Sequence, residues 1–387
     1  MSRYTSHPVW LVGFRPFFIF AMLAGMILPA LWVAIYTGKV AAPAHGFSAM
    51  QWHAHEMFFG FGWAVLGGFL LTATKNWVQV RGYHGWMLMF LAAAWLFERV
   101  GMWFEGVWPD ALFYISNNLF LGSIVAALLW TLIRNRRTDT YRDNFLFLLI
   151  LPLFLLTKHL MLSADYAQIG NSMAVGLFRV AILVMLERTL SAFMKAAFQV
   201  ELLKNIKLNM AIKLLAVSMV ISSLMTVQLA AAGALLLAVL LAVRLAYWQP
   251  RLAMRRLDIA IMYLGYLAVV TQLLIESFRL TGHFSVSASW SIHVFTLGAM
   301  GLIIPAMLVR IGKGHTGRKV NFDSLDKSAL YLMMVAFVFR ILAPLFYPIN
   351  YSIWVTFAAA CWFACFTLMA SRYIPMLMQP RVDGKAH

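Results

Sequence analysis

The chain has 387 residues, of which 63% are hydrophobic and 12% charged, and its mean hydropathy is +0.80. This composition excludes an ordinary soluble globular domain and indicates a protein that lies in a lipid bilayer. The formal net charge of +17 would suit a nucleic-acid partner, but the basic residues are spread over alternate short connectors instead of one patch. We therefore expect no nucleic-acid binding.

A membrane-spanning helix needs about 20 mostly apolar residues. The chain offers twelve segments near that length, in the order 14–36, 52–75, 84–104, 110–133, 144–163, 169–194, 208–226, 228–247, 258–280, 286–311, 324–346 and 350–371. The boundary near Thr226 is the weakest, because merging the seventh and eighth segments would reverse the direction of every later helix. The sequence predicts an all-α integral membrane protein, a bundle of about 12 transmembrane helices in a single polytopic domain over residues 1–387.

Connectors rich in Lys and Arg are typical of the cytoplasmic side of a membrane. These residues gather in every second connector: Arg3; Lys75 and Arg81; Arg134 to Arg142; Lys195 to Lys213; Arg251 to Arg256; Lys313 to Lys319; and Arg372 to Lys385. The intervening connectors, such as those from Lys39 to His45 and around His283, carry almost none. We therefore predict that both termini are cytoplasmic.

The two cysteines limit the covalent chemistry of the chain. Cys361 and Cys365 are four residues apart in an apolar segment, so they share a helix face and are expected to be buried thiols. The sequence has no C-x-x-C-H haem-attachment motif. Any haem would therefore be bound non-covalently, as haem b.

Four histidines fall at one depth in this topology, in the outer third of the bilayer, because an α-helix rises about 1.5 Å per residue. They are His53 and His55 in the second helix, His159 in the fifth and His293 in the tenth. A single histidine in a membrane helix commonly makes only an interhelical hydrogen bond. Four at one depth favour a metal or haem site, because neutral imidazole is a common ligand of copper and haem iron.

The spacing of the first two histidines separates their roles. If the segment from Trp52 to Met57 is helical, His53 and His55 point about 200° apart and cannot both bind one metal ion. One would then bind haem or copper between helices, while the other would serve a second centre or a hydrogen bond. If the segment is not helical, both could bind one ion.

Buried arginines are candidate partners for the two propionates of a haem, since arginine binds carboxylates through two parallel hydrogen bonds. Those in the outer halves of the predicted helices are Arg99, Arg179, Arg279 and Arg340. The alternative is that Glu98 with Arg99, or Glu276 with Arg279, form ion pairs that satisfy buried charge.

A second polar set is predicted on the cytoplasmic side, at Phe14–Phe18, Thr74–Trp77, Arg142–Phe145, Glu187–Arg188 and Arg310–Arg318. Interfacial Arg, Lys and Trp are ordinary membrane anchors. Glu187 and Arg188 lie too deep for that role. The set is alternatively a second cofactor, quinol or proton-entry region, with His315 as a further cofactor-binding candidate.

At these positions the sequence resembles the NnrS family, bacterial membrane proteins linked to nitric oxide. The matching elements are Gly13–Phe18, Trp52–Met57, Gly68–Ala73 with Asn76–Trp77, Arg142 with Asn144–Phe145, His293 with Thr296 and Gly298–Gly301, and Gly314–Arg318. The resemblance implies a haem b and copper protein of the bacterial inner (cytoplasmic) membrane. It implies a role in nitric oxide metabolism or in the response to nitrosative stress.

The chain departs from the patterns of two families, which limits the residue assignments that can be transferred from each. The family pattern in the sixth helix looks like Gly-Arg-x-Ile-Pro-x-Phe-Thr-Arg-Asn, whereas residues 187–196 keep Arg188 and Phe193 but lack the proline, threonine and asparagine. The plan is also similar to subunit I of haem-copper oxidases and nitric oxide reductases. However, the chain has no His-His pair in the seventh helix and no His-x-His in the tenth, so those ligand assignments do not transfer.

The leading interpretation is a membrane protein that binds nitric oxide through haem b and copper, with ligands drawn from His53, His55, His159 and His293. Turnover as in a nitric oxide reductase would consume two protons for each pair of nitric oxide molecules reduced to nitrous oxide. Glu56 and Glu187 are the candidate proton donors, and quinol or another redox partner would supply electrons. The alternative is a non-catalytic transporter, or a nitric oxide or redox sensor, with buried charges along a substrate path.

Overall fold

The computed structural model describes residues 5–42 and 46–385, so Arg3 and His45 lie outside the described residues. Within these ranges the chain is helical and contains no β-strand. Twelve helical segments are long and apolar enough to cross a membrane: Phe14–Tyr36, Ala49–Trp77, Trp86–Phe104, Asp110–Arg134, Arg142–Leu162, Ala167–Phe198, Ile206–Leu224, Val227–Tyr247, Leu257–Leu280, Ala288–His315, Ser324–Phe346 and Pro348–Met378. The predicted all-α protein with about twelve membrane-spanning helices is confirmed.

The weakest predicted boundary is also resolved. Helix α8 (Ile206–Ser218) continues as a 3-10 turn to Leu224, and Thr226 then caps α9 (Val227–Tyr247) by accepting a hydrogen bond from the Leu229 N–H. A helix that starts with its own side-chain cap is separate from the one before it. The seventh and eighth segments are therefore two helices, as predicted.

The chain forms two compact units, which are described separately. Unit 1 comprises Met1–Gly170, Leu308–Asn321 and Trp362–His387, and unit 2 comprises Asn171–Met307 and Phe322–Cys361. Helices α7 (Ala167–Phe198), α13 (Gly301–His315) and α16 (Tyr351–Met378) each contribute residues to both units. The single domain expected from the sequence stays a prediction.

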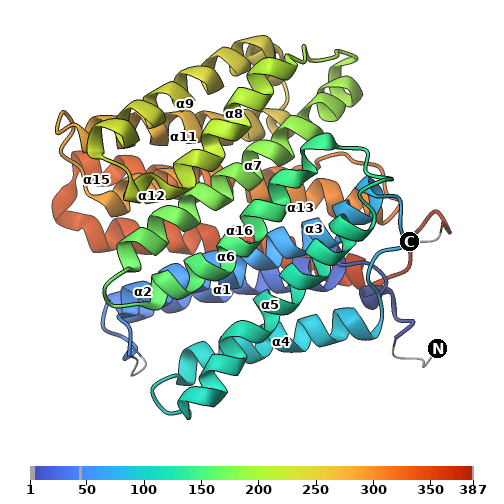
Figure 1. The fold of residues 1–387 in the computed structure, drawn as a ribbon, viewed down its shortest axis with the longest axis horizontal. Coiled ribbons are helices and arrows are strands. Elements are labelled where there is room, and N and C mark those ends of the chain that lie inside the picture. The colour runs from blue at the N-terminus through green and yellow to red at the C-terminus, as the bar shows by residue number, and fades with distance from the viewer. Residues whose placement is uncertain (1–4, 43–45, 386–387) are drawn as a thin grey trace. The chain divides into compact units, whose positions relative to one another are not determined.

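In unit 1, α1 (Phe14–Tyr36) packs on α3 (Trp63–Trp77), α4 (Trp86–Phe104) packs on α5 (Asp110–Arg134), and α6 (Phe145–Leu162) packs on α5 (Figure 1). Glycines allow several of these approaches. A Cβ on Gly68 would lie 2.8 Å from the Phe17 side chain, and one on Gly67 would lie 2.8 Å from Ile124. Side chains of neighbouring helices therefore fill the space beside Gly67 and Gly68.

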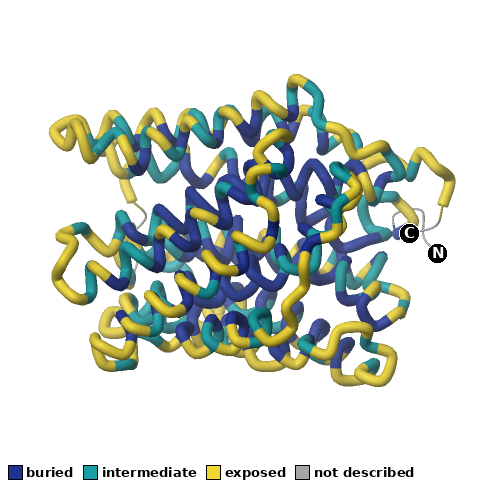
Figure 2. The backbone as a smooth tube through the Cα atoms, turned by 90° about the horizontal axis from the view of Figure 1, so that it is seen from above, coloured by how far each residue is buried: buried dark blue, intermediate teal, exposed yellow. Residues whose placement is uncertain are grey.

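In unit 2, α9 packs on α11 (Leu257–Leu280) and on α8, and α11 packs on α12 (Ala288–Phe295). Short helices α10 (Pro250–Ala253) and α15 (Ala343–Phe346) lie near helix ends, and α14 (Ser324–Phe337) precedes α15. Leu229, Leu236, Val239 and Val243 of α9 are exposed. Figure 2 shows buried and exposed residues along the helices, and mostly exposed residues in the connectors. Exposed apolar residues on a spanning helix suit contact with lipid.

Three spanning segments contain a π-helical turn, a rare feature that is frequent at functional sites. These turns are Glu56–Gly62 between α2 (Ala49–His55) and α3, Thr296–Met300 between α12 and α13, and Val338–Leu342 between α14 and α15.

The first two of these segments have the same construction. Each begins with a serine cap, at Ser48 or Ser287, and each carries a histidine just before the π-turn. Both contain the spacing Trp-x-x-His-x-x-x-x-Gly, at residues 52–60 and 290–298. His55 and His293 therefore occupy the same position relative to the tryptophan and the glycine of this spacing.

Candidate polar sites in the membrane-spanning helices

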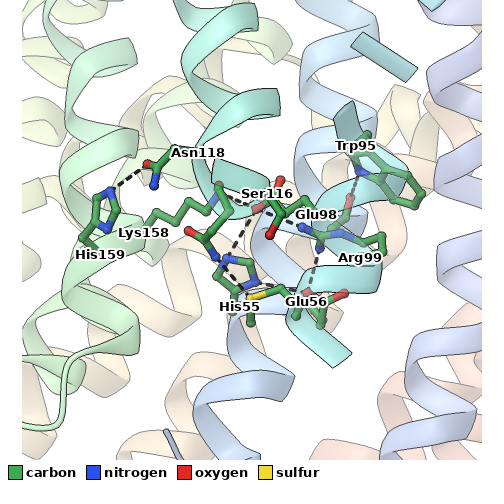
Figure 3. Close-up of polar contacts among 12 residues, drawn as sticks. His55, Glu56, Trp95, Glu98, Arg99, Ser116, Asn118, Lys158 and His159 are labelled. Carbon is green, nitrogen blue, oxygen red and sulfur yellow. Dashed lines mark hydrogen bonds and ion pairs between the residues drawn. The ribbon is translucent and has the colours of Figure 1, made fainter. Parts of the chain in front are cut away.

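A cluster of charged side chains lies inside unit 1, and we call it the His55 cluster: His55, Glu56, Glu98, Arg99 and Lys158 (Figure 3). They come from α2, the first π-turn, α4 and α6. The side chains of His55, Glu98 and Lys158 have no solvent exposure, and Glu56 is 3% exposed. Ionisable groups at such depth are costly in a membrane protein and usually mark a functional region.

The contacts in the His55 cluster form a continuous network. The two His55 ring nitrogens face two carboxylates, with Nδ1 3.1 Å from Glu56 Oε1 and Nε2 3.6 Å from Glu98 Oε1. Arg99 bridges the same two carboxylates, at 2.8 Å from Glu56 and 3.0 Å from Glu98. Lys158 binds Glu98 and donates to the Asn117 carbonyl. Two carboxylates thus face two cations, so the charges balance with a neutral imidazole.

The local backbone explains why these groups meet. Glu98 and Arg99 are adjacent on α4, and the Trp95 indole of the same helix donates a 3.1 Å hydrogen bond to the Gly60 carbonyl in the π-turn. A Cβ on Gly60 would lie 2.4 Å from Arg99 Nη1, so glycine leaves space for the guanidinium. On the other side, Gln51 donates to the Met161 carbonyl and ties α2 to α6.

The other two histidines that the sequence predicts at this depth in unit 1 have separate surroundings. His53 stacks on Trp32 with ring centroids 4.3 Å apart, whereas His55 faces Glu98, as helical spacing predicts. His159 Nε2 lies 2.9 Å from the Asn118 side-chain oxygen. Among the residues that the structure describes, no three or more His, Cys, Asp or Glu side chains are grouped to hold a metal ion.

Unit 2 contains a second buried network, which joins α7, α11 and α12. Arg179 Nη2 donates to Gln272 at 2.8 Å, and Gln272 contacts the Ser291 hydroxyl at 3.3 Å. Ser291 donates to Glu276 at 2.9 Å, and Arg279 forms an ion pair with Glu276 at 2.6 Å. The expected pairing of Glu276 with Arg279 is therefore present, while Arg179 has only a neutral amide as its hydrogen-bonded partner among the described side chains.

His293 lies one turn from Ser289 on α12, and its Nδ1 is 2.7 Å from the Ser289 carbonyl oxygen. Such a hydrogen bond makes Nδ1 the protonated nitrogen and leaves Nε2 as the basic one. Arg340, in the third π-turn, stacks over the Tyr351 ring at 5.3 Å. A Cβ on Gly298 would meet Phe337 at 2.7 Å, so helix packing fills the space beside this glycine.

The polar residues predicted for the cytoplasmic side divide between the units. In unit 1, the His315 ring lies 5.4 Å from the Phe14 ring, and Arg15 donates to the Leu377 and Gln379 carbonyls at the end of α16. A cation at the carboxyl end of a helix is stabilising. Arg15 and His315 are thus brought together near the C-terminal segment.

In that segment, Arg381 donates to the His315 carbonyl at 3.1 Å and binds Asp383 at 2.6 Å. This hydrogen-bonded ion pair lowers the pKa of Asp383 to about 2. Glu187 belongs to unit 2 instead, where its Oε1 accepts a 2.8 Å hydrogen bond from Lys213.

The sequence matches a known protein family over nearly its whole length. Residues 8–381 match the family described as NnrS protein. The chain belongs to the NnrS family. No curated protein matches it. Membership and the twelve spanning helices together identify a multi-pass membrane protein of the nitric oxide response.

Sequence reasoning did not single out several members of these networks. Lys158, Gln272, Lys213 and Arg244 have partners 19 or more residues away in the chain. The available signal was a charged residue in the middle of an apolar segment, as Lys158 is beside His159. Which distant residue completes each pair depends on helix packing, which the sequence pattern does not specify.

Proposed function

We propose that this NnrS-family protein binds nitric oxide inside the membrane at a haem b, with His293 as a ligand of the haem iron. The observation that carries the proposal is the 2.7 Å contact between His293 Nδ1 and the Ser289 carbonyl. Metal-binding histidines almost always donate their second ring N–H to a carbonyl or carboxylate, because this fixes the ring and makes the other nitrogen a better ligand.

The residues around His293 suit a haem with its two propionates. Arg179 is buried and hydrogen-bonded to the neutral Gln272. A propionate would compensate its charge through the bidentate contacts that arginine favours. Arg279, already paired with Glu276, and Arg340 are further candidates from the same unit, and Arg99 in unit 1 is engaged by Glu56 and Glu98. When bound, the haem would supply the iron that binds nitric oxide.

Copper fits the described residues less well. His53, His55 and His159 have different neighbours, and no group of three ligands forms among the residues that the structure describes. These three histidines remain candidate ligands from the sequence, but we assign no step of the function to copper.

Proton supply is the second part of the proposal. Reduction of two nitric oxide molecules to nitrous oxide and water takes up two electrons and two protons, with quinol or another redox partner as the electron source. Glu56 is a buried carboxylate that contacts Arg99 and His55, so it is the candidate proton carrier in unit 1. Glu187, which is 18% exposed and forms an ion pair with Lys213, is the candidate proton carrier in unit 2.

The test is the cofactor content and nitric oxide binding of the purified protein. Pyridine haemochrome spectra and elemental analysis should show haem b in the wild-type protein and in His283→Ala, a change at an exposed connector residue, and a large loss in His293→Ala. The reduced protein should change its Soret band on anaerobic addition of nitric oxide. Wild-type protein with neither haem nor copper would refute the proposal, and nitric oxide consumption by the reduced protein would separate an enzyme from a binding protein.

A further inference from the structure

Arg244, in the last turn of α9, is a buried cation whose hydrogen-bonding capacity is only partly used by the described residues. The side chain is 2% exposed. Its Nε donates to the Tyr266 hydroxyl at 3.0 Å, and the guanidinium lies over the Trp248 ring at 4.6 Å. Among the described residues, its terminal nitrogens Nη1 and Nη2 have no hydrogen-bond partner. These two nitrogens form the fork that binds oxyanions through two parallel hydrogen bonds.

The orientation of this fork is fixed by unit 2. The Tyr266 hydroxyl that accepts from Arg244 donates in turn to the Leu241 carbonyl at 2.9 Å. The Tyr263 hydroxyl donates to the Trp248 carbonyl at 2.6 Å, which holds the residue whose ring lies under the guanidinium. Tyr266 and Trp248 are therefore positioning residues, and they hold Nη1 and Nη2 in place at little entropic cost on binding.

The nearby carboxylate does not satisfy Arg244. Glu187 Oε1 accepts from Lys213 at 2.8 Å, while Glu187 Oε2 is 3.5 Å from Arg244 Nη1, beyond a good hydrogen bond. In the Arg244 cluster, defined as Glu187, Lys213 and Arg244 with Tyr266 and Trp248, the two terminal nitrogens of Arg244 thus have no hydrogen-bond acceptor among the described residues. Buried donors without an acceptor are costly, and an oxyanion bound to both nitrogens would remove that cost.

The three charged side chains of the Arg244 cluster differ in solvent exposure. Arg244 is 2% exposed, Lys213 is 8% and Glu187 is 18%. Arg244 is in the last turn of α9, close to the predicted cytoplasmic connector. The cluster therefore lies close to the connector predicted to be cytoplasmic, and Lys213 and Glu187 are its more exposed members.

We propose that the Arg244 cluster is a binding site for an oxyanion, either a free one such as inorganic phosphate or the phosphate of an anionic lipid headgroup. The oxyanion accepts hydrogen bonds from Arg244 Nη1 and Nη2, and Lys213 adds a second positive charge. The site lies apart from His293 in sequence and needs no haem, so its test does not depend on the proposed function.

The experiment measures the melting temperature of purified protein in an uncharged detergent, because a ligand that binds only the folded state raises it. One arm titrates sodium phosphate against sodium chloride at constant ionic strength. The other adds phosphatidylglycerol against phosphatidylcholine. A selective rise with phosphate identifies a free oxyanion, and a rise with phosphatidylglycerol alone identifies a lipid headgroup; either supports the proposal.

Two pairs of variants test the residues. Arg244→Lys keeps the charge but removes the fork, and should weaken the apparent affinity by about tenfold, the cost of one charge-assisted hydrogen bond. Arg251→Lys, exposed on the next connector, is the matched control. Lys213→Gln should also weaken oxyanion binding, and Lys207→Gln, at an exposed residue of the same helix, is its control. This second pair tests the site if Arg244→Lys does not fold. Equal responses to both salts and both lipids, or full binding by both site variants, would overturn the proposal.

Discussion

Lys158 shows how much depends on one side chain. It has no solvent exposure, and it binds Glu98, which is also fully buried. Without Lys158, Arg99 has to compensate both Glu56 and Glu98, and the one buried negative charge left in excess costs about 3–5 kcal/mol. Lys158→Met should therefore lower the melting temperature of the purified protein sharply, as measured by thermal unfolding in detergent. Lys195→Met, which breaks an exposed pair with Glu201, should leave it nearly unchanged.

The double variant Lys158→Met with Glu98→Gln gives the decisive comparison. Since it removes both charges together, it should recover most of the stability lost in Lys158→Met. If the two substitutions instead destabilise additively, Lys158 and Glu98 are not coupled. At this scale the sequence offered a Glu98–Arg99 ion pair as one alternative, and it missed Lys158, because the packing of α4 against α6 decides which carboxylate this cation meets.

At the scale of helices, the sequence predicted lengths well and irregularities poorly. Apolar length decides where a helix crosses the membrane, so the expected segments match those observed within a few residues, apart from longer ends such as Met378 of α16. The π-turns at Glu56–Gly62 and Thr296–Met300 leave no trace in hydropathy. Only the repeated Trp-x-x-His-x-x-x-x-Gly spacing could have indicated that these two helices share an irregular construction.

Close helix approach can be tested at Gly170, where α7 begins beside the end of α6. A Cβ there would lie 2.4 Å from the Met161 backbone nitrogen, and backbone cannot move aside as a flexible side chain does. Gly170→Ala should destabilise the protein by about 1–3 kcal/mol, seen as a lower melting temperature. Gly122→Ala is the control, because a Cβ on Gly122 meets nothing within 4 Å. That change should be neutral or stabilising by up to about 1 kcal/mol; equal losses in both variants would contradict the packing argument.

At the scale of the whole molecule, composition and apolar length were enough for the fold class and the resembling motifs for the family, while the sites required coordinates. The residues that carry the NnrS resemblance include His55, His293 and His315, and sequence alone could not say what each contacts. His55 faces two carboxylates, His293 a backbone carbonyl and His315 the Phe14 ring. The three histidines thus have different local environments, which are determined by the residues around each of them.

The orientation of the chain in the membrane is predicted from the positive connectors and can be tested directly. Residues 134–142 carry four arginines, and the segment after Gly282 carries none before the next spanning helix. The first should be cytoplasmic and the second outside, because Lys and Arg next to spanning helices are retained inside. Alkaline phosphatase, active only outside the cytoplasm, should be active when fused after Gly282 and inactive after Asp139 or Gly384. Green fluorescent protein fused after Gly384 should fluoresce. The reverse pattern at all three sites would invert the topology and move His53, His55, His159 and His293 to the cytoplasmic half.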